Sequence, residues 1–576
     1  MKLISLLLLP VIALAQAPAD EKLNTIFADY KEYIFRNFPE SATYEGDKRY
    51  NDRITDHSAE AHFARYDSLR QFKSRVQEVN RNSISEANKI NYDLFLRMIN
   101  EDLEGEKFNG HYTPINQMGG LHINFPQLIN VQPLNNEKDY KDYISRLNKF
   151  PLQVNNIITN MRSGVKAGIT SARLTVEPVI TQIANIIDVP LDSSVFMVFP
   201  EAEKLNPATE KQIVEELRAA VKNITTAYKR LQLFVENEYL PAARKEVGIW
   251  SLPDGEARYK YAVKVYTSLD DMTQQEIFNT GNKEGERIKT EMQKVKNEIN
   301  FEGTLQEFNS HLRTSPEFFF TSKDSLMNAY RKILSRMDEQ MPSLFVHLPK
   351  TKYDLKEIEE YRARSAPAAY YYSAPDDGSR PGYFYVNTYD LSSRPKYTMT
   401  ALALHEAVPG HHTQIAIAKE MENMPWFRRE MGVTAFIEGW ALYAESLGYE
   451  KGMYDDPYQK YGALSFEMWR ACRLVVDAGM HHLKWTKQQA VDFMLQHLPH
   501  SELDINSEVD RYIAWPGQAL AYKTGELKIK ELRAKAEKEL GNDFDIRAFH
   551  TMLLSEGALP LALLEKNVNE WIRKNK

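Results

Sequence analysis

Cysteine is almost missing from this chain: Cys472 is the only one among 576 residues. No internal disulfide can form, so the fold has to be stabilised by a hydrophobic core, which a chain of this length can readily bury. Cys472 stands in the stretch Trp469-Arg470-Ala471-Cys472-Arg473-Leu474. We expect it to be packed inside a helix and not to act as a nucleophile.

An excess of positive charge and flexible linkers are lacking as well. The chain has 72 Lys and Arg against 79 Asp and Glu, and the basic residues are dispersed among the acidic ones. This pattern excludes a nucleic-acid-binding surface of the usual basic kind. Neither a Gly/Ser-rich or Pro-rich linker nor an internal repeat interrupts residues 16–576, and the composition is that of an ordinary globular protein.

The apolar run Leu3–Leu14 is too short to span a membrane. It follows Lys2 and ends in the small-residue stretch Ala13-Leu14-Ala15, a pattern that predicts a signal peptide over residues 1–15. No cysteine follows this cleavage site to carry a lipid. We therefore expect an exported protein, periplasmic or secreted, without a membrane anchor.

Helical periodicity is present through most of residues 20–340. Apolar residues recur at steps of three and four over 213–235, and Thr273 with Glu276 forms a capping-box pattern before a second apolar stripe at 288–299. Weaker helical patterns cover 22–38, 61–79 and 86–103. From residue 343 to 390 the period changes. Short aromatic and β-branched runs at 344–348, 369–372 and 382–387 predict a small sheet, with a hairpin turn at 375–381.

Three histidines and one glutamate stand within the eight residues 405–412, a density typical of a zinc site. On an unbroken helix, at about 100° per residue, His412 returns close to the azimuth of His405, whereas His411 faces elsewhere. Pro409 and Gly410 disfavour an unbroken helix, and a break there could place His411 beside His405. The residues themselves leave both histidines open as the second ligand. A chance pentad at a helix end is the simpler alternative.

The motif His405-Glu406-x-x-Pro409-Gly410-His411 resembles that of a bacterial family catalogued as domain of unknown function 885, which is thought to be related to helical zinc peptidases. In the family's pattern the histidine directly after Pro-Gly is the regular one, so the resemblance favours His411. The stretches 381–387 and 510–523 are also similar to recurring elements of that family.

A third ligand is expected from residues 434–445, which read as a buried helix with Glu438 and Glu445 seven positions apart on one face. A buried carboxylate needs a partner, and a metal ion is one. The stretch Phe436-Ile437-Glu438 resembles the position from which helical gluzincin-type peptidases, such as the oligopeptidase and angiotensin-converting-enzyme groups, supply their zinc-binding glutamate. We assign Glu438 as the third ligand and Glu445 as an acid behind it.

Two further segments supply candidates for substrate binding and for stabilising an oxyanion. Residues Tyr383, Tyr385 and Asn387 lie on a strand whose edge could hold an extended peptide, although the sheet could equally be a brace. Arg473, Asp477 and His481 are spaced by four on one helical face. An Asp477-oriented His481 could donate a hydrogen bond to a developing oxyanion.

The segment 510–523 adds a cation and two phenols. Arg511 could clamp a substrate carboxylate or could simply pair with Glu508, and Tyr522 or Tyr512 could donate to the oxyanion.

These observations predict a mainly α-helical, exported zinc metallopeptidase that hydrolyses small peptides. Residues 16–340 are expected to form part of a deep cleft, and residues 341–576 the catalytic region, with a small antiparallel sheet beside the metal helix. His405, His411 and Glu438 would hold Zn²⁺, and Glu406 would act as general base on metal-activated water. Hydrolysis of a non-peptide amide and a zinc-stabilised binding protein without turnover are the alternatives. No oligomeric state is predicted.

Overall fold

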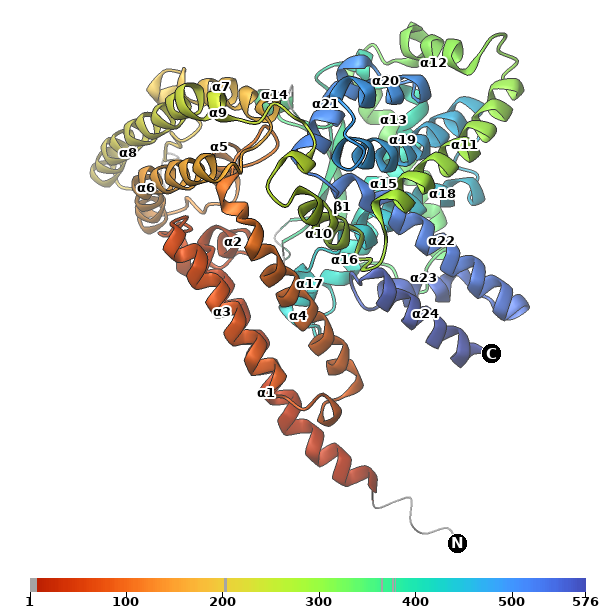
Figure 1. Cartoon of the computed structure of the whole chain (residues 1–576), viewed down its shortest axis with the longest axis horizontal. Helices are drawn as coiled ribbons and strands as arrows, with labels where there is room; N and C mark the ends of the chain where they lie inside the picture. Colours follow the sequence, from red (N-terminus) through yellow and green to blue (C-terminus); the bar gives the residue numbers. More distant parts are fainter. Residues whose placement is uncertain (1–7, 201–204, 364–365, 376–377, 379) are drawn as a thin grey trace. The chain divides into compact units, whose positions relative to one another are not determined.

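The computed structural model describes residues 8–576 except 201–204, 364–365, 376–377 and 379 (Figure 1). Residues 1–7 of the expected signal peptide lie outside the described part, so the signal peptide stays a prediction. Helix α1 (Leu8–Asn37) continues through the expected cleavage site. Among the described residues, no helix combines the length and the apolar character needed to cross a membrane.

The chain packs into two compact units, each with its own core. The first comprises residues 1–245 and the short insertion 423–430, and the second comprises 246–422 and 431–576. The division thus falls earlier than the boundary at residue 340 expected from the sequence. Side chains explain the difference, because Tyr259 and Ile277, which precede residue 340, share a buried cluster with Leu474 and Leu520.

The first unit is helical. Its core lies between α5, α6, α7 and α8, and all seven apolar residues of the stripe at 213–235 are buried in it, which confirms that prediction. After α1 its helices are α2 (Pro39–Tyr44), α3 (Ala59–Gln77), α4 (Glu86–Gly105), α5 (Leu121–Gln127), α6 (Glu137–Ala167), α7 (Arg173–Ile187), α8 (Pro207–Phe234), α9 (Leu240–Ala242) and α17 (Trp426–Glu430). Phe427 of α17 anchors the insertion by packing against Phe27 and Phe95.

The second unit is also mainly helical, in line with the predicted fold class. Its helices before the sheet are α10 (Gly255–Thr267), α11 (Gln274–Glu298), α12 (Leu305–Thr314) and α13 (Lys323–Gln340), followed by α14 (Glu360–Ala363) within it. After the sheet come α15 (Met399–Glu406), α16 (His411–Lys419), α18 (Thr434–Glu450), α19 (Pro457–His481), α20 (Lys487–His497), α21 (Glu502–Ala514), α22 (Ala521–Leu540), α23 (Ile546–Leu554) and α24 (Leu561–Asn575). The capping box at Thr273 is present, and so is one at Thr486.

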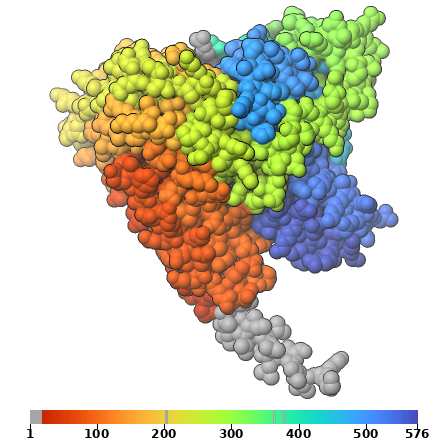
Figure 2. Space-filling model, in the orientation of Figure 1, coloured from red at the N-terminus to blue at the C-terminus, as the bar shows by residue number. Residues whose placement is uncertain are grey.

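Segments far apart in the sequence form one surface of this unit. In Figure 2 the green segment around α12 and the blue segment around α20 lie side by side. Arg313 at the end of α12 donates a hydrogen bond to the Leu498 carbonyl, 3.2 Å away, just beyond α20. The early helices of the second unit therefore pack with helices from its C-terminal part.

The sheet has three strands, β1 (Tyr353–Glu357), β2 (Ala369–Tyr372) and β3 (Gly382–Val386), in the order β1-β3-β2. The predicted hairpin is confirmed, since β2 and β3 are antiparallel. The sheet is mixed and not antiparallel throughout, because β1 runs parallel to β3. The expected strand at 344–348 does not form. Leu344 and Phe345 are instead buried, and Phe345 packs against Trp440.

Candidate metal centre

The metal motif is split between two helices. Helix α15 ends at Glu406 and α16 begins at His411, so the helix break expected from Pro409-Gly410 is present. The two helices approach closely at Gly410, where a Cβ atom would lie 1.9 Å from the carbonyl oxygen of His405. Only glycine fits at this point, and the turn brings His411 next to His405, with ring centroids 4.7 Å apart.

Glu438 of α18 reaches the same point. Its Oε2 lies 3.6 Å from Nε2 of His405 and 3.5 Å from Nε2 of His411. One ligand atom from each of these three residues lies within 4.8 Å of the others. No other group of three His, Cys, Asp or Glu in the described part of the chain meets this criterion.

The three residues fit a zinc ion. Ligand atoms about 2.0–2.1 Å from a tetrahedral metal would lie about 3.3 Å from one another, close to the two His–Glu distances above. Two histidines and one glutamate form a ligand set of catalytic zinc, which leaves a fourth position open. In addition, Oε2 of Glu438 is buried without a hydrogen-bond partner among the described residues, an arrangement that is costly without a cation.

Electrostatics at the cluster follow from this proximity. Burial disfavours the charged forms of Glu438 and His405. At Glu438 the two neighbouring histidines outweigh burial and hold its pKa well below the usual value. At His405, burial is likewise outweighed by the nearby carboxylates of Glu438 and Glu445, which raise its pKa to about 9. Glu438 is therefore held as a carboxylate, the form that binds a metal ion.

Glu445 lies behind His405, as expected from its spacing. The Nδ1–H of His405 donates to Oε1 of Glu445 across 2.7 Å, which directs Nε2 toward Glu438. Glu445 is held in turn by Arg470, whose guanidinium lies 3.5 Å away.

His412 does not join the cluster. Its Nδ1 lies 2.9 Å from the hydroxyl of Tyr371, and its ring packs 4.7 Å from that of Tyr353. Burial lowers its pKa to about 4. Of the two histidines that the sequence left open, the structure therefore brings only His411 to His405.

Glu406, the expected general base, lies at the edge of the sheet. Its Oε2 accepts a hydrogen bond of 2.9 Å from the backbone N–H of Tyr371 in β2. Sequence analysis did not identify Tyr371, because a main-chain donor has no residue-type signal. The pairing of Asn387 N–H with the Ala368 carbonyl sets the β2 register, so the N–H and C=O groups of Ala369 and Tyr371 point away from β3.

The predicted substrate strand has to be corrected. Tyr383 and Tyr385 belong to β3, the central strand, whose two edges are both paired. The side-chain amide of Asn387 donates to the carbonyl groups of Ala363 and Ala366, at 2.7 and 3.1 Å. These residues brace the sheet, and of the two edge strands, β1 and β2, it is β2 that contacts Glu406. The error arose because β1, which covers the other edge of β3, has no alternating apolar pattern.

Tyr522 lies near the cluster because α18 and α22 cross closely. A Cβ atom on Gly525 would lie 1.8 Å from the carbonyl oxygen of Ala435, and one on Gly439 would lie 2.5 Å from the backbone of Gly525. Burial and the neighbouring Glu438 carboxylate raise the pKa of Tyr522, so the phenol keeps its proton.

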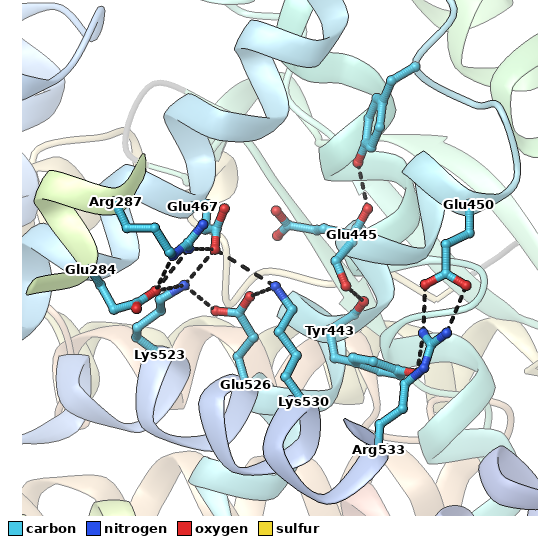
Figure 3. A network of polar contacts seen from close by, with 12 residues as sticks. Glu284, Arg287, Tyr443, Glu445, Glu450, Glu467, Lys523, Glu526, Lys530 and Arg533 are labelled. Carbon is cyan, nitrogen blue, oxygen red and sulfur yellow. Dashed lines mark hydrogen bonds and ion pairs between the residues drawn. The ribbon is translucent and has the colours of Figure 1, made fainter. Parts of the chain in front are cut away.

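A buried ion-pair network fixes the first turn of α22, which carries Tyr522 (Figure 3). The ammonium of Lys523 lies 2.7 Å from Glu467, 2.7 Å from Glu526 and 3.3 Å from Glu284. These partners come from α19, α22 and α11. The network therefore ties α22 to two other helices next to the cluster.

His481 does not act as predicted. Its Nδ1 accepts the backbone N–H of Ile249, and its Nε2–H donates to the carbonyl of Tyr512, both at 3.1 Å. Asp477 accepts hydrogen bonds from Tyr259, at 2.6 Å, and from the backbone of Gly517. Both ring nitrogens of His481 are thus committed to the backbone, which contradicts its assignment as an oxyanion donor.

Arg511 pairs with Glu508, the simpler of its two expected roles. Its guanidinium lies 3.1 Å from Glu508 and donates to the side chain of Gln518 at 2.7 Å. All three nitrogens of Arg511 have acceptors. The assignment of Arg511 as a substrate clamp is therefore not supported. The hydroxyl of Tyr512, the other expected oxyanion donor, accepts a hydrogen bond of 2.9 Å from Nε of Arg473.

Comparison with solved structures gives two similar chains. A "putative lipoprotein" from Colwellia psychrerythraea is 29% identical, with a TM-score of 0.92 over 96% of this chain and 99% of that chain. A "putative lipoprotein of unknown function" from Shewanella oneidensis is 18% identical, with a TM-score of 0.73 over 94% of this chain and 99% of that one, and shows likeness of fold. No protein with a curated description matches the chain.

The family comparison covers most of the sequence, including both units and the whole metal motif. Residues 39–568 match the family described as "Bacterial protein of unknown function (DUF885)". The resemblance expected from the Pro-Gly-His motif is thereby confirmed, and the chain belongs to this bacterial family.

Proposed function

We propose that this protein is a zinc-dependent peptidase of small peptides, related to the helical gluzincin-type enzymes. The observation that supports this most strongly is the convergence of His405, His411 and Glu438, with Glu406 one residue from the first ligand. When bound, zinc would activate a water molecule for attack and polarise the scissile carbonyl.

The residues around the cluster have separate tasks in this proposal. Glu406 accepts the proton of the attacking water and passes it to the leaving amine. The hydrogen bond from the Tyr371 N–H orients one oxygen of Glu406 and leaves the other free for this work. Tyr522, which keeps its proton, donates to the developing oxyanion.

The free edge of β2 would align the substrate. The Ala369 N–H and the Ala369 and Tyr371 C=O groups point outward and can pair with an extended peptide, while the Tyr371 N–H stays on Glu406. A peptide bound there lies with its backbone next to the general base. This role replaces the one expected for β3.

We also propose that the protein works outside the cytoplasm. The pattern of residues 1–15 supports export, and the related chain from Colwellia psychrerythraea is described as a lipoprotein candidate.

A digest of a mixed peptide pool tests the function. We expect the purified protein to hold close to one equivalent of zinc, to cleave peptides, to stop after chelation and to recover when zinc is restored. Stoichiometric zinc without cleavage of any peptide would contradict the proposal and would favour a binding protein or a hydrolase of a non-peptide amide.

A further inference from the structure

We propose that Arg473 binds a carboxylate of the substrate, so that the site selects peptides by an acidic group, with the C-terminal carboxylate as the first candidate. This inference rests on the proposed peptidase function and adds a substrate class to it. It moves the carboxylate receptor from Arg511, which the sequence suggested, to a neighbouring arginine on α19.

Arg473 has a spare donor. Its Nε donates to the Tyr512 hydroxyl at 2.9 Å and one terminal nitrogen donates to Glu508 at 3.1 Å. The other terminal nitrogen, NH1, is buried and has no hydrogen-bond partner among the described residues. The side chain is only 5% exposed. A guanidinium nitrogen that is removed from water and left unpaired costs stability, and such groups are kept where a ligand uses them.

The local charge count points to an anion. Arg473 and Arg511 both pair with the same carboxylate, Glu508, which holds one negative charge against two positive ones. The cations keep the pKa of Glu508 at about 2, despite burial, so this carboxylate is ionised. Arg470, one turn earlier on α19, is already engaged with Glu445. The pair therefore retains one positive charge that a substrate carboxylate would neutralise.

Arg473 is connected to the metal cluster on two sides. Its guanidinium lies 4.3 Å from the ring centre of Tyr522, the phenol whose pKa responds to Glu438. On the same helix, Arg470 contacts Glu445, which holds His405. A carboxylate on Arg473 would thus lie across Tyr522 from the cluster.

Two aromatic rings cover Arg473. The rings of Trp469 and Tyr522 flank the guanidinium, at 4.8 and 4.3 Å, and solvent does not reach NH1. Tyr522 is the flanking ring next to Glu438, so a substrate held at the cluster would approach Arg473 past this ring. The same phenol would then contact both the scissile group and the bound carboxylate.

Matched peptide pools test the proposal. Two N-acetylated pentapeptide pools without Asp or Glu differ only in a C-terminal acid or amide, and two amide-blocked pools differ only in one internal Glu or Gln. Binding is measured by calorimetry on the Glu406→Gln protein and cleavage by mass spectrometry on the unsubstituted protein. We expect binding and cleavage of the acid pool to exceed those of the amide pool at least tenfold. A preference for the Glu pool instead would assign the same receptor to an acidic side chain.

Substitutions link the preference to Arg473. In Arg473→Gln the acid-to-amide ratio should fall to near one. In Arg473→Lys, which keeps the charge but loses the planar fork, the ratio should be intermediate. The matched control is Arg533→Gln on α22, which removes an arginine paired with Glu450 of α18 (Figure 3) and with Glu537 of its own helix. Its ratio should equal that of the unsubstituted protein.

Two results would overturn the inference: no carboxylate preference in the unsubstituted protein, or an equal loss for the acid and amide pools in both Arg473 variants. Because binding is measured without turnover, a preference for acids in a protein that cleaves nothing would support Arg473 as the receptor and contradict the peptidase function alone.

Discussion

Glu445 Oε1 lies 2.7 Å from Nδ1 of His405, and this contact fixes which nitrogen of the imidazole faces Glu438. A ligand histidine is commonly held by such an acceptor, which sets its tautomer and raises its basicity. Glu445 is seven residues from Glu438 on the same helix, so α18 both supplies one ligand and orients another.

Loss of this contact should weaken the metal site without removing it. We expect Glu445→Gln to lower zinc affinity by about 10–100-fold, because an amide is a poorer acceptor than a carboxylate. Competition with a chelator of known affinity measures the change. Unaltered affinity would show that Glu445 has no part in orienting His405.

The two neighbouring histidines should behave differently. His411→Ala should abolish stoichiometric zinc binding, whereas His412→Ala should retain it, because His412 contacts Tyr371 and not the cluster. Metal analysis after gel filtration checks both variants. Loss of zinc in the His412 variant with retention in the His411 variant would reverse the assignment.

The crossing of α18 and α22 should tolerate no side chain at Gly525. A Cβ atom there meets the Ala435 carbonyl, so Gly525→Ala should destabilise the protein by about 1–3 kcal/mol or more. Gly432 is the control, since its Cβ would meet nothing within 4 Å and its backbone has no positive φ. Denaturant unfolding compares the two, and equal midpoints would contradict the close crossing.

Asp477 should give stability a distinct pH dependence. Burial, partly offset by hydrogen bonds from Tyr259 and Gly517, raises its pKa in the folded chain to about 7, above the ordinary value of 3.8. Between these values the folded state binds more protons than the unfolded state, so the contribution is present at low pH and is lost as pH rises through 7.

The Asp477→Asn variant isolates this effect. Between pH 4 and pH 7 the unfolding free energy of the unsubstituted protein should fall more than that of the variant. The difference between the two decreases should reach up to about 4 kcal/mol, at about 1.4 kcal/mol per pKa unit. Paired urea titrations across this range measure the difference. Parallel pH profiles would show that Asp477 has an ordinary pKa.

Local patterns predicted the parts of the fold that depend on neighbouring residues. The stripe of α8, the capping box of α11 and the β2–β3 hairpin all follow from spacing within one segment. The strand order did not follow, because parallel pairing of β1 with β3 joins segments separated by α14 and β2.

The same distinction holds at the site. The helix break at Pro409-Gly410 could be predicted because it is local, whereas the choice of His411 over His412 came from the family resemblance. The surroundings of His481 could not, because its ring nitrogens bond to Ile249 and Tyr512 from other parts of the chain. Arg473 was noted only as part of a helical face, and its unpaired nitrogen is visible only in three dimensions.

The most direct test of the account is the rate of peptide cleavage by Glu406→Gln, measured together with its zinc content. We predict that zinc remains at one equivalent while kcat falls by at least about 100-fold, because the variant lacks the proton acceptor but keeps all three ligands. Cleavage at the unsubstituted rate, with zinc bound, would contradict the assignment of Glu406 as general base and with it the proposed peptidase chemistry.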